Sequence, residues 1–120
     1  MRITSKARTP PLALPGGLRT NYDLFRRPEG SDADILFTLQ VNQPGTSTPD
    51  GTHDLEQWFF VHRGRVRFVI DGEAVVAEPG ELVYVPRNAV HRHEVLGDEP
   101  VEQLVIDHWP RDSKDRLGLD

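Results

Sequence analysis

The sequence predicts one all-β domain, built as a sandwich or a barrel. The chain has 120 residues, about one domain's worth, and an ordinary composition for a globular protein, with 37% hydrophobic and 28% charged residues. Short runs with strand-like patterns follow one another, separated by turn signals rich in Gly, Pro and Asp. No segment has the period of an amphipathic helix of normal length. Many short strands with regular turns favour a closed or two-layered β structure.

Residues 1–34 are predicted to be an extended arm that packs on the domain or on a partner subunit. The segment is rich in Pro, Gly and Arg and shows no sustained period, so we expect one short strand in it at most. Leu12, Leu14 and Leu18 are too apolar for a free tail, yet Pro and Gly interrupt them. We therefore expect the arm to lie along another sheet and to contribute to a homodimer.

Residues 35–109 carry the predicted strands, and residues 110–120 form a polar tail. The run Trp58-Phe59-Phe60 predicts a strand buried on both faces. Asp71-Gly72 between two such runs is a strong hairpin signal. The expected strands cover residues 35–41, 57–62, 65–70, 74–77, 82–85, 90–96 and 101–109. The expected core consists largely of Phe59, Val61, Val66, Phe68, Val83, Val85 and Val105.

Charge and composition exclude several classes of function. The formal net charge is −5 and the Arg residues are scattered, which argues against nucleic acid or an anionic membrane as a partner. The absence of Cys excludes disulfides, thiolate catalysis and thiolate metal sites. No apolar run is long enough for a membrane span or a signal peptide, so we expect a cytoplasmic protein.

Two motifs carry the functional signal. In the first, Gly45 is followed after five residues by Gly51-Thr-His53, then by Gln57, and after six further residues by Gly64. In the second, Gly80 is followed after five residues by Pro86-Arg-Asn88, and then by His91. The spacing resembles the two-part signature of the cupin superfamily, over residues from about 35 to 107.

The resemblance implies a double-stranded β-helix, the jelly-roll barrel of cupins, and a metal site at one mouth of the barrel. Four positions depart from the family's pattern. Gly51 stands where the first metal-binding His is usual, Gln57 replaces the usual Glu, and Asn88 and Val95 replace a Gly and an Asn of the second motif. Asn tolerates the left-handed backbone conformation that a turn Gly supplies. Gly51 removes an imidazole, so metal affinity should be lower than in a complete site.

By this resemblance, His53, Gln57 and His91 are the expected metal ligands. Two neutral imidazoles and an amide oxygen suit Zn, Fe, Ni or Cu. His93 follows His91 by two residues and thus shares its face of the strand, so it is a candidate fourth ligand or proton-transfer residue. Asp107 is a second candidate for proton transfer. The alternation in the last strand leaves open whether the face of Asp107 or the face of His108 is turned inward.

The favoured function is a small metal-dependent cupin enzyme acting on a small organic molecule. A divalent metal would polarise a carbonyl or enol oxygen while His93 or Asp107 moves a proton, in isomerase or cyclase chemistry on a sugar or polyketide-like substrate. An iron-dependent dioxygenase is the alternative among enzymes. The competing class is a non-catalytic binding or sensor cupin that has lost its metal.

Overall fold

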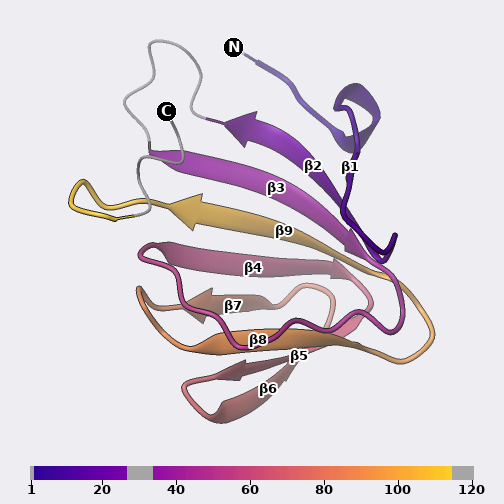
Figure 1. Cartoon of the computed structure of the whole chain (residues 1–120). Coiled ribbons are helices and arrows are strands. Elements are labelled where there is room, and N and C mark those ends of the chain that lie inside the picture. The colour runs from indigo at the N-terminus through magenta and orange to yellow at the C-terminus, as the bar shows by residue number, and fades with distance from the viewer. Residues whose placement is uncertain (1, 27–33, 115–120) are drawn as a thin grey trace.

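The computed structural model describes residues 2–26 and 34–114, and within them the fold is two antiparallel β-sheets that face each other (Figure 1). The only described helical element is a short 3₁₀ turn, η1 (Lys6–Arg8). The larger sheet has six strands, in the order β1 (Leu12–Ala13), β2 (Arg19–Arg26), β3 (Ile35–Asn42), β9 (Val101–His108), β4 (Glu56–Arg63) and β7 (Leu82–Val85). The smaller sheet has three strands, in the order β6 (Glu73–Ala77), β5 (Arg65–Ile70) and β8 (His91–Leu96). This arrangement is the predicted jelly roll. Among the described residues, no helix has the length and apolar character needed to cross a membrane.

The turns follow the expected local chemistry. Asp71 and Gly72 join β5 to β6 with positive φ angles of 48° and 84°. A two-residue hairpin turn with both residues in this region matches the twist of the flanking strands. Asn88 also has a positive φ, 65°, at the position where the second motif usually has Gly. An Asn side chain at this point therefore serves the same backbone conformation.

The core lies between the two sheets and contains all seven residues predicted for it. Val61, Val66 and Phe68 are fully buried, and Phe59 packs on Phe68 with ring centroids 5.0 Å apart. Burying a side chain of this size stabilises the fold by roughly 1.5–3 kcal/mol. The predicted set within the cluster is Phe59, Val61, Val66, Phe68, Val83, Val85 and Val105. The alternating pattern thus identified which side chains meet between the sheets.

The prediction that the aromatic run is buried on both faces was wrong. β4 lies between β9 and β7 in the larger sheet, but only its inner face is covered, by the smaller sheet. Phe59 is buried, whereas Phe60 is 38% exposed and Trp58 packs on Tyr84 of β7 across the outer face. An antiparallel sheet can leave one face to solvent, and an aromatic side chain is compatible with either face.

The predicted arm contains two strands rather than one. β1 pairs with β2, and β2 pairs with β3, from Arg19 opposite Asn42 to Arg26 opposite Leu36. Residues 19–26 are therefore part of the larger sheet. The structure brings Arg19 next to the interior, as described below.

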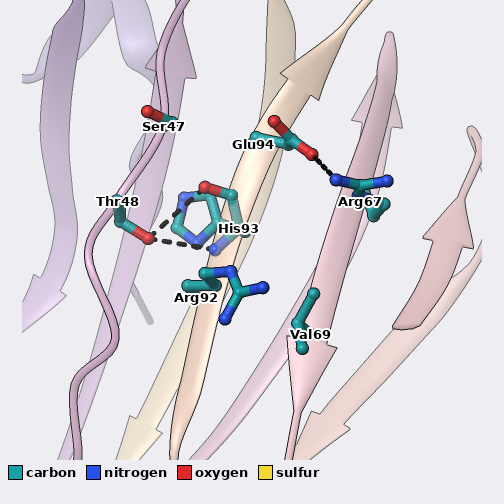
Figure 2. Close-up of a pocket in the computed structure, with 7 residues that line it drawn as sticks. All are labelled: Ser47, Thr48, Arg67, Val69, Arg92, His93 and Glu94. Carbon is teal, nitrogen blue, oxygen red and sulfur yellow. Dashed lines mark hydrogen bonds and ion pairs between the residues drawn. The ribbon is translucent and has the colours of Figure 1, made fainter. Parts of the chain in front are cut away.

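The segment that carries the first motif runs beside β8 as an irregular strand. Thr46 accepts a backbone hydrogen bond from Val95, and Thr48 donates one to His93, both of 2.9 Å. Gly51 and His91 exchange two backbone hydrogen bonds, of 2.9 and 3.0 Å. Figure 2 shows this segment at Ser47 and Thr48, alongside β8. The pairing brings the residues of the first motif to the start of the strand that carries the second.

Candidate functional site

A cavity of about 140 Å³ lies between the sheets and brings the residues of both motifs together. Its wall includes three of the described His residues, from the first motif segment and from β8. No carboxylate is among its lining side chains. The lining residues are Arg19, Gln40, Thr48, Pro49, Gly51, His53, Gln57, Phe59, His91 and His93.

His53 and His91 lie side by side in this wall. Their ring centroids are 5.2 Å apart and the rings are inclined at 57°. The Nδ1 of His91 lies 3.0 Å from the carbonyl oxygen of Ala89. A carbonyl can only accept, so Nδ1 carries a proton, and the neutral form of the ring then has its lone pair on Nε2. His91 is thus held in a tautomer that can bind a metal through Nε2.

Gln57 presents its amide between the cavity and Asp107. The two residues are cross-strand partners on β4 and β9, and Gln57 Nε2 donates a hydrogen bond of 2.8 Å to Asp107 Oδ1. Gln57 Oε1 is buried and accepts no hydrogen bond from a described residue. This pair also shows that the face of Asp107, and not the face of His108, is turned inward. Burial raises the pKa of Asp107, an effect that the hydrogen bond from Gln57 opposes.

Gly51 lines the cavity, as its place in the first motif predicts. A Cβ atom at this residue would meet no other atom within 4 Å, and its φ is outside the left-handed region. The structure therefore has room for a side chain where the family's first His is usual.

His93 also lines the cavity and is held by Arg19 of β2. Arg19 Nη2 lies 2.9 Å from His93 Nε2, and Arg19 Nε donates a hydrogen bond of 2.8 Å to Asn42 Oδ1. Because a guanidinium can only donate, His93 Nε2 is the acceptor. Burial lowers the pKa of His93 to about 3, with a further contribution from Arg19. His93 is therefore neutral at pH 7, and its Nε2 is occupied by Arg19.

A second pocket, of about 250 Å³, lies on the outer side of the smaller sheet. Figure 2 shows that Arg67 and Glu94 point toward each other there and form an ion pair. Arg92 pairs with Asp50 at 3.0 Å. His93 is the only residue of the predicted site among its lining residues, which are Ser47, Thr48, Arg67, Val69, Arg92, His93 and Glu94. The cavity between the sheets is thus the better candidate, although it is smaller.

The donors in the cavity fit a divalent metal only if Gln57 takes part. Among the described residues, no group of three or more His, Asp or Glu side chains is placed to hold an ion. Zinc lies about 2.0–2.1 Å from an imidazole nitrogen, so rings 5.2 Å apart are close enough to share one ion. The buried Gln57 Oε1 supplies a neutral oxygen donor without losing a described hydrogen bond. His53, Gln57 and His91 therefore fit a sparse three-donor site.

Arg19 is a candidate site residue that the sequence did not indicate. It lies in the segment interpreted as an arm, where no motif marks it. Its only signal is the alternation of polar Arg19, Asn21 and Asp23 on β2, which fits a strand with a polar inner face. The surrounding segment is rich in Pro, Gly and Arg, and this composition indicated an arm rather than a strand.

The family model of the cupin domain matches residues 38–107 of the sequence. The chain belongs to the cupin family. No curated protein matches this cupin at a significant level. Solved structures show the same fold at low sequence identity, and at these identities the likeness concerns the fold alone.

Three of these structures cover nearly the whole cupin chain. The polyketide cyclase RemF from Streptomyces resistomycificus is 22% identical with a TM-score of 0.78, over 93% of this chain and 82% of the cyclase. A predicted oxalate decarboxylase from Thermotoga maritima is 18% identical with a TM-score of 0.80, over 91% of this chain and 100% of that protein. KdgF from Halomonas sp. is 12% identical with a TM-score of 0.75, over 93% and 97% of the two chains.

Proposed function

We propose that this cupin is a metal-dependent enzyme that catalyses proton transfer on a small organic molecule, in isomerase or cyclase chemistry. The observation that carries the proposal is the buried, unpartnered Oε1 of Gln57 in the same cavity wall as His53 and His91. A buried polar atom without a partner is costly, and a metal ligand role would remove that cost. The similarity in fold to a polyketide cyclase agrees with this class of chemistry.

In this proposal His53, His91 and Gln57 hold the ion. When bound, a divalent metal supplies Lewis acidity that polarises a carbonyl or enol oxygen. The hydrogen bond from Gln57 to Asp107 orients the amide so that its oxygen, and not its NH₂ group, is available to a ligand. The proton of His91 on Nδ1 orients that ring in the same way.

Asp107 and His93 have different parts in the proposed proton transfer. Burial raises the pKa of Asp107, which makes its carboxylate a better proton acceptor than an exposed one. His93 is neutral at pH 7, and with a pKa of about 3 it is a weak base. Of the two, Asp107 is therefore our candidate for accepting a proton, and it lies behind Gln57 rather than in the cavity wall. His93 keeps its own proton on Nδ1 and positions Arg19 through Nε2.

Metal analysis of untagged protein tests the proposal. Wild type should hold one metal ion per chain, and His53→Ala and His91→Ala should each lose it while the fold is kept, because neither ring belongs to the apolar core cluster. His62→Ala is the matched control, since this exposed residue of β4 does not line the cavity. Full metal content in either cavity variant would contradict the assignment. Oxygen consumption by the metal-loaded protein would indicate an iron-dependent dioxygenase instead.

A metal-free binding cupin is the second candidate, because the described residues offer only two imidazoles and an amide to an ion. Wild-type protein that holds no metal, even after reconstitution with Zn, Fe, Ni and Cu, would favour this candidate. The same cavity would then bind an organic ligand through Arg19, Gln57 and the His rings without chemistry at a metal.

A further inference from the structure

We propose that Arg19 forms an anion-binding subsite in the cavity and that the ligand of this cupin carries a carboxylate or a similar planar oxyanion. The inference deepens the proposed function by naming the ligand class, and it holds equally for the metal-free candidate. It rests on the position of Arg19, on its missing counter-charge and on its fixed orientation.

Among the described residues that line the cavity, Arg19 is the only Arg or Lys, and none is an Asp or Glu. His93 Nε2 accepts a hydrogen bond from Arg19, so this ring is a neutral partner of the guanidinium. A ligand that enters this cavity therefore meets the guanidinium of Arg19 in the same wall as the rings of His53 and His91.

Arg19 has no counter-ion among the described residues, whereas three other Arg side chains each have one. Arg67 pairs with Glu94, Arg87 with Asp54 at 2.5 Å, and Arg92 with Asp50. Those pairs lie near the surface, where water solvates a cation and an ion pair contributes little. Arg19 is half-buried, where an unpaired charge is most costly. Burial also lowers its pKa, and a bound anion would offset that loss of hydration.

Two neutral acceptors fix the guanidinium in its plane. Asn42 Oδ1 takes the Nε proton and His93 Nε2 takes one proton of Nη2. A guanidinium has five N–H donors, so three remain without a described acceptor, two of them on Nη1. Carboxylates are bound by such donors in pairs. Asn42 and His93 accept from only two of the five donors, and neither offers a negative charge. Arg19 can therefore still bind an anionic ligand.

The size of the cavity limits what Arg19 can hold. About 140 Å³ accommodates a few heavy atoms, since one water molecule occupies about 30 Å³. The subsite therefore fits a small carboxylic acid, or the acidic end of a larger molecule whose remainder stays outside.

The test compares acetate with acetamide, its neutral isostere, on the full-length protein after metal removal with a chelator. Binding is followed by NMR of the Arg19 Nε–H and the His93 ring, with sodium chloride at equal ionic strength as reference. We expect acetate to shift both signals and to bind at least ~10-fold more tightly than acetamide, because a hydrogen-bonded charge pair contributes roughly 1.5–3 kcal/mol. Equal binding of the two, or no acetate binding, would overturn the proposal without any variant.

Two variants then locate the site. Arg19→Gln should lose at least ~10-fold in acetate affinity, and the matched control Arg92→Gln, on the outer side of β8, should keep wild-type affinity. Thermal unfolding of both variants checks the fold. Equal losses in the two variants would show that acetate binds to general surface charge. Because metal is absent throughout, failure of the metal assignment leaves this outcome unchanged, and failure here leaves the metal analysis unchanged.

Discussion

The amide of Gln57 donates to the carboxylate of Asp107 across β4 and β9, and this one bond decides which end of the amide faces the cavity. A Gln amide has a donor end and an acceptor end. Asp107 takes the donor end, so Oε1 is directed away from it and is buried without a described partner. In this cupin Asp107 therefore orients Gln57 so that its amide oxygen, and not its NH₂ group, is available as a metal ligand.

The first prediction tests this orientation. Asp107→Ala removes the acceptor and should weaken metal binding at least ~10-fold, as loss of an outer-shell partner typically does. Asp107→Asn keeps an acceptor oxygen and should lose less. Calorimetric titration of zinc into the metal-free variants measures both. If Asp107→Ala binds zinc as tightly as wild type does, Asp107 has no role in orienting Gln57.

The second prediction concerns Gly51. Gly51→His should tighten metal binding, because the side chain enters open space in the cavity wall and adds a nitrogen donor. Turnover should fall, since the added ligand occupies a position that substrate needs. Zinc titration and activity assays of the two forms check both parts. Gly51→Ala is the control, and equal affinities of Gly51→His and Gly51→Ala would show that residue 51 does not reach the metal.

The third prediction concerns pH and the loop that carries His53. Asp54 accepts hydrogen bonds from Arg87 and from the backbone N–H of Lys114, and these lower its pKa to about 2. A carboxylate with a depressed folded pKa stabilises the protein above its unfolded pKa, near 3.9. This contribution should disappear as the pH falls from about 4 towards 2.

Asp54→Asn isolates that contribution. Urea unfolding at pH 6 and at pH 2.5 should show a smaller loss of stability for Asp54→Asn than for wild type. Asp98→Asn is the control, because this exposed residue has no described partner and should behave as wild type. Parallel pH profiles of wild type and Asp54→Asn would contradict the prediction.

The fourth prediction is a homodimer that uses the larger sheet. Its outer apolar face, defined as Ile35, Phe37, Trp58, Leu82 and Ile106, lines one shallow surface depression. Leu82 is 58% exposed there, and Leu12 of β1 is 52% exposed at the edge of the same sheet. Exposed apolar patches of this kind mark interaction sites.

Light scattering over a range of concentrations tests the dimer. Wild type should be dimeric, and Leu82→Glu and Leu12→Glu should each shift it towards the monomer. Val75→Glu, a change of similar exposure on β6 of the smaller sheet, should leave the dimer intact. A monomeric wild type would refute the prediction.

The sequence predicted the parts of the fold that local chemistry controls. Asp71-Gly72 defined its hairpin, and the motif spacing placed His53, Gln57 and His91 in one wall. The sequence did not predict that Phe60 is exposed. Hydrophobicity shows that a strand is apolar but not how many of its faces are covered. The direction of Asp107 was undecided, because both faces of β9 alternate equally well. Only the cross-strand register with Gln57 resolves it.

The missed residue, Arg19, shows a different limit. Its neighbours along the chain say nothing about a cavity, because its partners Asn42 and His93 are 23 and 74 residues away. Contacts of this kind depend on how the sheet is ordered, and that order places β2 at the far side of β3 from the motif strands.

The place of β2 has a consequence for how this protein can diversify. The family model begins at residue 38, so the three proposed metal ligands lie inside the matched region while Arg19 lies before it. A protein trimmed to the matched region would keep those ligands and lose its cavity cation. If both proposals hold, chemistry and substrate choice are encoded in separate stretches of the chain. A change in β2 could therefore shift ligand preference to neutral or cationic molecules without altering any of the proposed metal ligands.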